Sequence, residues 1–120
     1  MGAFSGRVRV SVPRMGLGEQ AATTLALVVH ELATNSLKYG ALSSPNGTLD
    51  ISCDHHDTNV VVVWTERGGP AVSVPAGDAG YGSQLLNRSM TLQLGGSISC
   101  DWCAEGIIVT LHMTRERLAR

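Results

Sequence analysis

Three polar side chains of different chemistry, Glu31, Asn35 and Lys38, stand at positions i, i+4 and i+7 of one segment. In a helix this spacing puts a carboxylate, an amide and an ammonium group on one face. Each group would need its own partner if the helix were otherwise buried, so the stripe is a candidate functional site. A solvated helix face is the alternative interpretation of the same spacing.

Glycines and a second carboxylate follow later in the chain. Gly68 and Gly69 stand in the segment WTERGGP, and Gly80 and Gly82 in GYGSQL. Glycines let backbone approach a ligand closely, and a helix start opened by glycines offers N–H donors to phosphate oxygens. Glu66 can accept a hydrogen bond from an exocyclic amine such as that of adenine. The alternative for each glycine is turn geometry alone.

The elements that must position these residues can be predicted from periodicity. Residues 7–12 alternate between polar and apolar, which predicts a strand with one buried face. Residues 19–39 contain no Gly or Pro and predict a long helix. The first half of that helix is apolar on nearly every side, so we expect it to be buried all round.

The rest of the chain predicts strands, turns and one more helix. Residues 40–47 are expected to form a loop, 48–53 a strand, 54–59 a hairpin connection and 60–64 a central strand. Residues 67–80 predict a loop, and a helix should start at 80–82 and end near Leu94 before Gly95 and Gly96. Residues 98–102 and 107–113 predict a closing hairpin. The order is typical of an α+β fold, a two-layer sandwich with helices on one face of a mixed β-sheet.

Composition limits the class of protein. The chain has 120 residues, 43% hydrophobic and 16% charged, with a net charge of −1, so we expect a single domain over 1–120, with 114–120 a charged tail or the start of a helix. The charge balance disfavours binding to a nucleic-acid backbone. No apolar run approaches the roughly 20 residues of a membrane helix, so we expect no direct membrane insertion and a cytoplasmic location, although a full-length protein could be tethered. Three cysteines fit a reducing compartment.

Weaker motifs are interpreted as structural. The segment at 16–21 imitates a dinucleotide fingerprint, but the acidic residue such a site needs would fall inside the long helix. Cys100 and Cys103 form a single C-x-x-C pair without a redox context. Cys53, His55 and His56 are expected to be adventitious neighbours rather than metal ligands.

The candidate segments together resemble a known family. HELATNSLKYGALS resembles the N box of the GHKL ATPase superfamily in the form found in HWE histidine kinases, and His30, Trp64 and Glu66 stand at the positions that give that family its name. WTERGGP resembles its altered first glycine box, and GYGSQLL resembles its second. The motifs occur in the right order, and the resemblance extends from the first strand to about Met113.

This resemblance implies the Bergerat (GHKL) ATP-binding fold and a role for each residue of the stripe. Asn35 would coordinate Mg²⁺ through its carbonyl oxygen, and Glu31 would orient or deprotonate the attacking group. Lys38 would reach the phosphates, and Glu66 would recognise the adenine amine. The remaining nucleotide-binding positions that the resemblance implies lie in the glycine boxes: Gly68, Gly69, Gly80, Tyr81, Gly82 and Leu85.

The function implied is that of the catalytic domain of a two-component sensor histidine kinase. It would bind Mg-ATP and transfer the γ-phosphoryl group to a histidine on a separate dimerisation domain, with a response regulator as the further partner. No segment here resembles the region that carries that histidine. One alternative is another GHKL ATPase or serine kinase, which the Trp-x-Glu motif disfavours, as does a short ATP lid, since only about ten residues separate Gly69 from Gly80. The other alternative is a non-catalytic partner-binding module. His30 points about 100° away from Glu31, and we expect it to support packing or a neighbouring loop.

Overall fold

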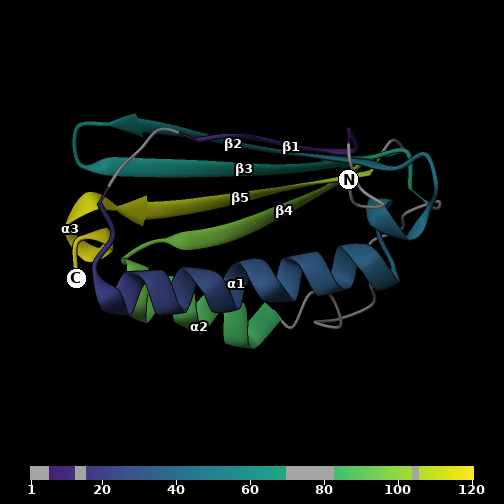
Figure 1. The fold of residues 1–120 in the computed structure, drawn as a ribbon. Helices are drawn as coiled ribbons and strands as arrows, with labels where there is room; N and C mark the ends of the chain where they lie inside the picture. Colours follow the sequence, from purple (N-terminus) through teal and green to yellow (C-terminus); the bar gives the residue numbers. More distant parts are fainter. Residues whose placement is uncertain (1–5, 13–15, 70–82, 104–105) are drawn as a thin grey trace.

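The computed structural model describes residues 6–12, 16–69, 83–103 and 106–120. Its strands form one five-stranded sheet in the order β1-β2-β3-β5-β4, and α1 and α2 both lie on one face of it (Figure 1). The strands are β1 (Val8–Ser11), β2 (Thr48–His56), β3 (Asn59–Arg67), β4 (Ser97–Cys103) and β5 (Gly106–Thr114). The helices are α1 (Glu19–Lys38), η1 (Ala41–Ser43), α2 (Ser83–Leu94) and α3 (Arg115–Leu118).

The pairing of the strands makes the sheet mixed. β1 runs parallel to β2, whereas β2 with β3, β3 with β5 and β4 with β5 are antiparallel. The strand predicted to be central, β3, is paired on both sides along its whole length. The predicted α+β sandwich, with its helices on one face, is therefore confirmed.

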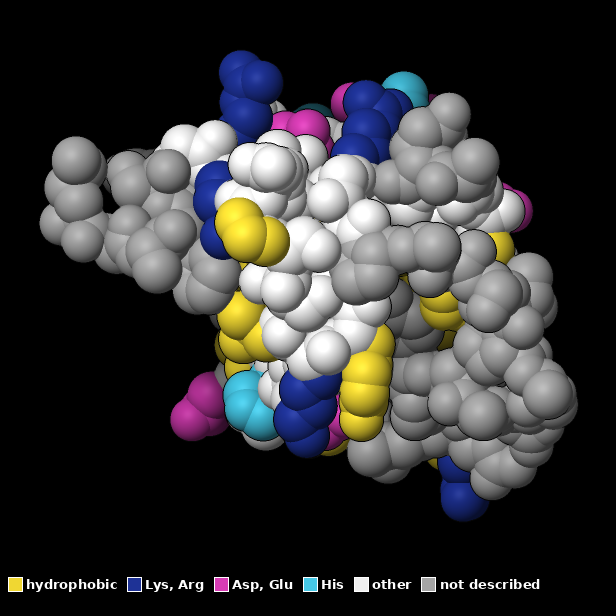
Figure 2. All heavy atoms as spheres, turned by 90° about the vertical axis from the view of Figure 1, so that its right-hand side faces the viewer, with side chains coloured by type: hydrophobic (Ala, Val, Ile, Leu, Met, Phe, Trp, Pro, Cys, Tyr) yellow, Lys and Arg dark blue, Asp and Glu magenta, His cyan; other side chains and the backbone are white. Residues whose placement is uncertain are grey.

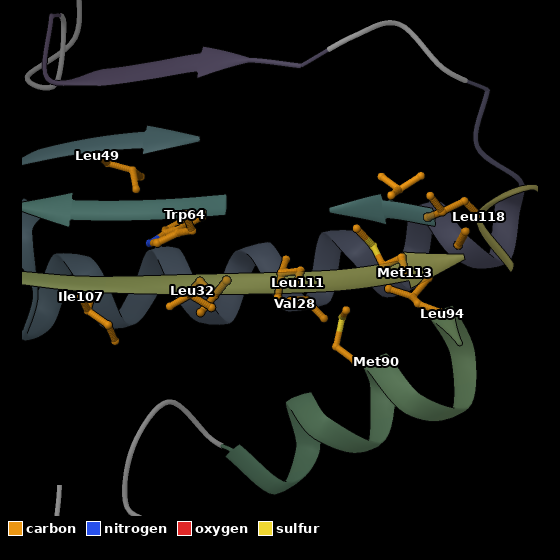
Figure 3. Packing of buried hydrophobic residues seen from close by; sticks show 13 residues of the cluster. Val28, Leu32, Leu49, Trp64, Met90, Leu94, Ile107, Leu111, Met113 and Leu118 are labelled. Carbon is orange, nitrogen blue, oxygen red and sulfur yellow. The ribbon is translucent and has the colours of Figure 1, made fainter. Parts of the chain in front are cut away.

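One hydrophobic cluster fills the space between the sheet and the helices (Figure 3). Trp64 projects from β3 toward α1, and Leu32 faces it from the helix side of the core. Met90 and Leu94 extend the cluster to α2. The alternation of β3 and β5 supplies the sheet side, because every second residue of a strand points to the same face.

The burial of α1 differs from the prediction for its first half. Its buried residues, Ala21, Val28, Leu32 and Ser36, recur at helical spacing along a single line. Leu27, expected to be buried, is 43% exposed, and Val29 is exposed as well. The expectation of burial all round was wrong because a helix on one face of a sheet contacts neighbours on only part of its circumference.

Two strand boundaries also differ from the prediction. β2 continues to His56 and β3 begins at Asn59, so the hairpin turn is Asp57 and Thr58 rather than six residues. Asp57 has φ 47°, a left-handed conformation that Asp tolerates better than most residues.

β1 is an edge strand, and Val10 on it is exposed, so only the Val8 end of its apolar face packs against the core.

The last residues form a short helix, one of the two expectations for 114–120, and they pack against the fold instead of forming a tail. α3 follows β5 directly, and Leu118 is 2% exposed within the hydrophobic cluster. The Leu118 carbonyl accepts the Gly18 N–H at 2.8 Å, just before α1 begins. Within the described ranges, no helix is long and apolar enough to cross a membrane.

Candidate functional site

The Trp-x-Glu segment forms a buried hydrogen-bonded pair. Trp64 and Glu66 are two residues apart on β3, so their side chains leave the same face of the sheet. The Trp64 indole N–H donates to Glu66 Oε2 at 2.7 Å, and Glu66 is only 1% exposed. A buried carboxylate needs such donors, because an unpartnered charge in the core is very costly.

The other oxygen of Glu66 joins β3 to the segment after α1. The Ala41 backbone N–H donates to Glu66 Oε1 at 2.9 Å. Ala41 follows the end of α1, where the Tyr39 and Gly40 N–H groups close the last turn on the Asn35 carbonyl at 2.8 and 3.1 Å. The segment that carries Asn35 and the segment that carries Glu66 are thus tied together by one side chain.

Close backbone packing explains the glycines around this junction. A Cβ on Gly40 would lie 2.2 Å from Glu66 Oε1, and one on Gly47 would lie 1.7 Å from the Ala41 carbonyl oxygen. A Cβ on Gly69 would lie 2.7 Å from the Ala41 Cα. Gly68 has φ +76°, a backbone conformation that residues with a side chain rarely adopt. The structure therefore gives Gly68 and Gly69 structural roles, and their contact with a ligand stays a prediction.

Arg7 holds the loop between η1 and β2 from the edge of the sheet. Its Nε donates to the Gly47 carbonyl at 2.8 Å, and its guanidinium also donates to the Ser44 carbonyl. The Leu49 N–H donates in turn to the Arg7 carbonyl at 2.8 Å. Because Gly47 packs directly on Ala41, Arg7 stabilises the backbone that presents the Ala41 N–H to Glu66.

The predicted polar stripe lies on the second half of α1, as expected. Glu31 and Asn35 are half-buried and Lys38 is exposed. Asn35 Nδ2 is buried and, among the described residues, is the side-chain polar atom that lacks a hydrogen-bond partner. An unused buried donor is costly in the free protein, so it indicates a group that a ligand would satisfy.

Several predicted residues lie outside what can be described. Gly80, Tyr81 and Gly82 belong to residues 70–82, outside the described ranges, and so does the predicted start of the second helix. Leu85 lies on the backbone of α2, and the position of its side chain is not described. His30 is exposed on α1, so it is not part of the buried core, and the expected support of a neighbouring loop stays a prediction.

The end of the molecule at which α1 ends is seen in Figure 2. White side chains and backbone occupy much of its middle together with a few hydrophobic side chains, and Lys and Arg side chains lie around them with some acidic side chains between. Lys38 ends α1 here, and Arg67 ends β3 beside the buried Glu66. Cationic groups at this end would favour an anionic ligand such as a phosphate chain.

The cysteines show no sign of nucleophilic chemistry. Burial raises the pKa of the Cys100 thiol, and the neighbouring Asp101 carboxylate raises it further. Burial and Asp54 act in the same direction on the pKa of Cys53. The Cys103 thiol donates to the Gly106 carbonyl at 3.3 Å. A raised pKa lowers the thiolate fraction, so the Cys53 and Cys100 thiols are weak nucleophiles.

Sequence reasoning did not identify the support around Glu66. The sequence places Trp64 at the family's Trp-x-Glu position without a hydrogen-bond partner, and it assigns no role to Ala41, Gly47 or Arg7. The signal for Trp64 was present, because a two-residue spacing on a strand puts both side chains on one face and a buried indole N–H needs an acceptor. No local signal exists for the other three, because their contacts depend on loop packing.

Comparisons with known proteins point to one class of enzyme. No family model matches the chain. The chain is 43% identical over 106 residues to blue-light-activated histidine kinase 1 of Erythrobacter litoralis, an alignment that covers 87% of this chain and 29% of that protein. It is 34% identical over 110 residues to a blue-light-activated histidine kinase of Brucella anthropi, covering 88% of this chain and 22% of that protein. The chain thus spans less than a third of the length of these curated relatives.

Solved structures share the fold at low sequence identity. The Erythrobacter litoralis EL346 blue-light activated histidine kinase matches with a TM-score of 0.75 and 17% identity, over 89% of this chain and 34% of that one. The catalytic domain of histidine kinase ThkA matches with a TM-score of 0.69 and 16% identity, over 90% of this chain and 79% of that one. The second match covers most of an isolated catalytic domain, so the described elements account for that unit's fold.

Proposed function

We propose a function from the premise that this chain is a homologue of the blue-light-activated histidine kinases and has the fold of a histidine kinase catalytic domain. The proposed function is to bind Mg-ATP and to transfer the γ-phosphoryl group to a histidine. The observation that carries the proposal is the junction at Glu66. It joins the segment bearing Glu31, Asn35 and Lys38 to the end of β3 through the Ala41 N–H. Nucleotide binding and phosphoryl transfer need the polar side chains of α1 and the carboxylate at the end of β3 at one site.

Asn35 suits a magnesium-bound phosphate chain. Its amide is half-buried and Nδ2 has no partner within the described part of the chain. Turning the amide by 180° exchanges the nitrogen with the oxygen at nearly constant shape, so the group can offer a donor to phosphate or a carbonyl oxygen to a hard cation. Mg²⁺, when bound, would neutralise charge on the phosphates.

The other side chains supply positioning and charge. Lys38 would attract the phosphates, and Glu31 would orient the accepting imidazole or take its proton. The Glu66 carboxylate retains a lone pair on each oxygen after its two protein bonds, so it can still accept an exocyclic amine. Gly68, Gly69, Gly80, Tyr81, Gly82 and Leu85 are proposed to line the nucleotide.

The partners proposed are a histidine-bearing dimerisation domain and a response regulator. Because the chain spans only part of its relatives, the accepting histidine would lie on another part of a longer protein. The bond between the γ-phosphorus and the ADP oxygen breaks, and a phosphorus–nitrogen bond forms on the imidazole.

The location proposed for this reaction is the cytoplasm. ATP is available in that compartment, and the free cysteines fit its reducing conditions.

Nucleotide binding is tested by the melting temperature of the chain. At Mg-ATP about a hundredfold above Kd, linkage predicts about 2.7 kcal/mol of added stability, a rise of several degrees for a chain of this size. Labelled ATP with a histidine-bearing domain supplied as a separate chain then tests transfer. No rise in melting temperature at millimolar Mg-ATP would exclude the proposed kinase activity. A rise in melting temperature without phosphoryl transfer would favour the non-catalytic binding module.

A further inference from the structure

We propose that Trp64 is a positioning residue that makes the nucleotide site specific for a purine with an amine at C6, as in adenine, over one with a carbonyl oxygen there, as in guanine. The inference rests on the function proposed above and concerns how Glu66 is held. The indole N–H donates to Glu66 Oε2 at 2.7 Å, and both side chains are buried. A hydrogen bond from a neutral donor to a buried carboxylate is among the stronger ones in proteins.

The surroundings of the pair leave the carboxylate few other donors. Trp64 is paired in register with Ile51 and Val109, and Glu66 with Leu49 and Ile107. All four neighbours are apolar, so the adjacent strands offer no side-chain donor at these positions. Among the described residues, the Trp64 indole and the Ala41 amide are the groups that donate to Glu66.

This arrangement determines what the site can recognise. Both oxygens of Glu66 accept a hydrogen bond, which a carboxylate can do and a Gln amide, with one oxygen and one NH₂, cannot. The hydrogen-bonding capacity that remains on the Glu66 carboxylate is that of an acceptor only. A base that presents an amine can donate to it, whereas a base that presents a carbonyl oxygen there would oppose lone pair to lone pair. Without the indole N–H, Oε2 loses the contact that fixes the orientation of the carboxylate.

The main experiment compares ATP and GTP binding in the wild-type chain, Trp64→Phe and Trp102→Phe. Trp64→Phe keeps an aromatic ring and removes the N–H, so the preference for ATP over GTP should fall about 10-fold, as loss of one buried polar contact does. Trp102→Phe, the matched control on β4, should leave the preference unchanged. A purely structural role for Trp64 would lower the melting temperature of the chain without changing the ratio of the two affinities.

A nucleotide-free measurement tests the hydrogen bond itself. Glu66→Gln must turn an NH₂ toward one of two N–H donors and should lower the melting temperature. Adding Trp64→Phe removes one of those donors, so the double variant should lose less than the sum of the two single losses. Additive losses would overturn the proposal.

The last arm uses the unmodified chain, which keeps the proposal testable if Trp64→Phe does not fold. In ¹⁵N-labelled protein, the indole N–H resonance of Trp64 is the one that remains in Trp102→Phe. In the unmodified chain, this resonance should shift on addition of ATP and shift less on addition of GTP. Equal shifts with both nucleotides, or an unchanged ratio of affinities in Trp64→Phe, would overturn this inference alone. If the wild-type chain binds neither nucleotide, the proposed function fails and this inference with it.

Discussion

At the scale of single residues, Asn35 and Glu66 differ in whether their buried polar atoms have hydrogen-bond partners. Glu66 is buried, and both of its oxygens accept hydrogen bonds, so the folded chain itself supports this carboxylate. Asn35 is half-buried, and its buried Nδ2 donor has no partner among the residues that the structure describes. An unsatisfied group lowers stability, and retaining it is expected where a ligand completes its bonding. The residue that costs stability is therefore the stronger candidate for direct ligand contact.

Asn35→Ala should change stability and binding in opposite directions. Without ligand, removing the orphaned donor and gaining helix propensity should raise the free energy of unfolding by about 0.5–1 kcal/mol. With Mg-ATP, loss of the polar contact should weaken binding by about 1–3 kcal/mol. Thermal melts with and without Mg-ATP measure both, and Thr34→Ala on the same helix is the control. A destabilised free protein, or undiminished Mg-ATP binding, would contradict the role given to Asn35.

Glu31→Gln should separate binding from chemistry. The substitution keeps the shape of a half-buried side chain and removes its ability to take a proton. Mg-ATP affinity should be retained, while phosphoryl transfer to an added histidine-bearing domain should fall by about 10²-fold or more. Binding and transfer are measured on the same preparation. If affinity is lost but transfer per bound nucleotide is kept, Glu31 is a binding residue instead.

At the scale of elements, the loop from Gly40 to Gly47 connects α1 to the sheet by backbone contacts. The Ala41 N–H donates to Glu66, Gly47 packs against the Ala41 carbonyl, and Arg7 holds the Gly47 carbonyl. No step of this chain of contacts depends on a large apolar side chain. The position of Glu66 is therefore sensitive to substitutions in a loop that contributes no catalytic group.

Gly47→Ala should disturb both stability and the site. Its Cβ would lie 1.7 Å from a backbone oxygen, so the loop must move, at a cost of about 1–3 kcal/mol or more. Movement of Ala41 would also weaken the hold on Glu66 and lower Mg-ATP affinity. Gly16→Ala is the control, because nothing lies within 4 Å of the added Cβ. Thermal melts and nucleotide titration are the measurements, and equal behaviour of the two variants would refute the close packing.

At the scale of the whole molecule, the C-terminal segment supports the start of the long helix α1. α3 packs against the start of α1, where the Leu118 and Arg120 carbonyls accept the Gly18 and Gln20 N–H groups at 2.8 and 3.2 Å. These bonds satisfy donors that a helix start leaves free. The Arg117 guanidinium donates to the Leu92 carbonyl at the end of α2 at 2.7 Å. α3 therefore joins both long helices to β5.

Leu118→Ala should destabilise the molecule as a core substitution does. Leu118 is 2% exposed, and its truncation should cost about 2–5 kcal/mol. Leu92→Ala is the matched control, because Leu92 is 60% exposed on α2 and should cost less than about 0.5 kcal/mol. Denaturant titration of both variants gives the comparison. A small effect at Leu118 would mean that residues 114–120 behave as the charged tail expected from their composition.

Much of the architecture follows from local patterns. The 20-residue α1, the central β3 and the closing hairpin β4–β5 were all predicted, because helical and alternating periodicities appear directly in the order of residues. The candidate site residues on α1 and β3 were likewise identified from their types and spacing. Local patterns failed where one element's environment depends on another, as for the exposed Leu27 and the packed Leu118.

The contacts that hold the site together are long-range. Ala41 and Glu66 are 25 residues apart, and Arg7 and Gly47 are 40 apart, so no periodicity records their pairing. The Trp-x-Glu spacing shows that the two side chains share a face, and only the folded sheet shows that they bond to each other in the core. Residue types and elements are encoded locally because they depend on neighbours along the chain. The support of Glu66 is decided by packing, because backbone donors from a distant loop can reach it only after the sheet and α1 have come together.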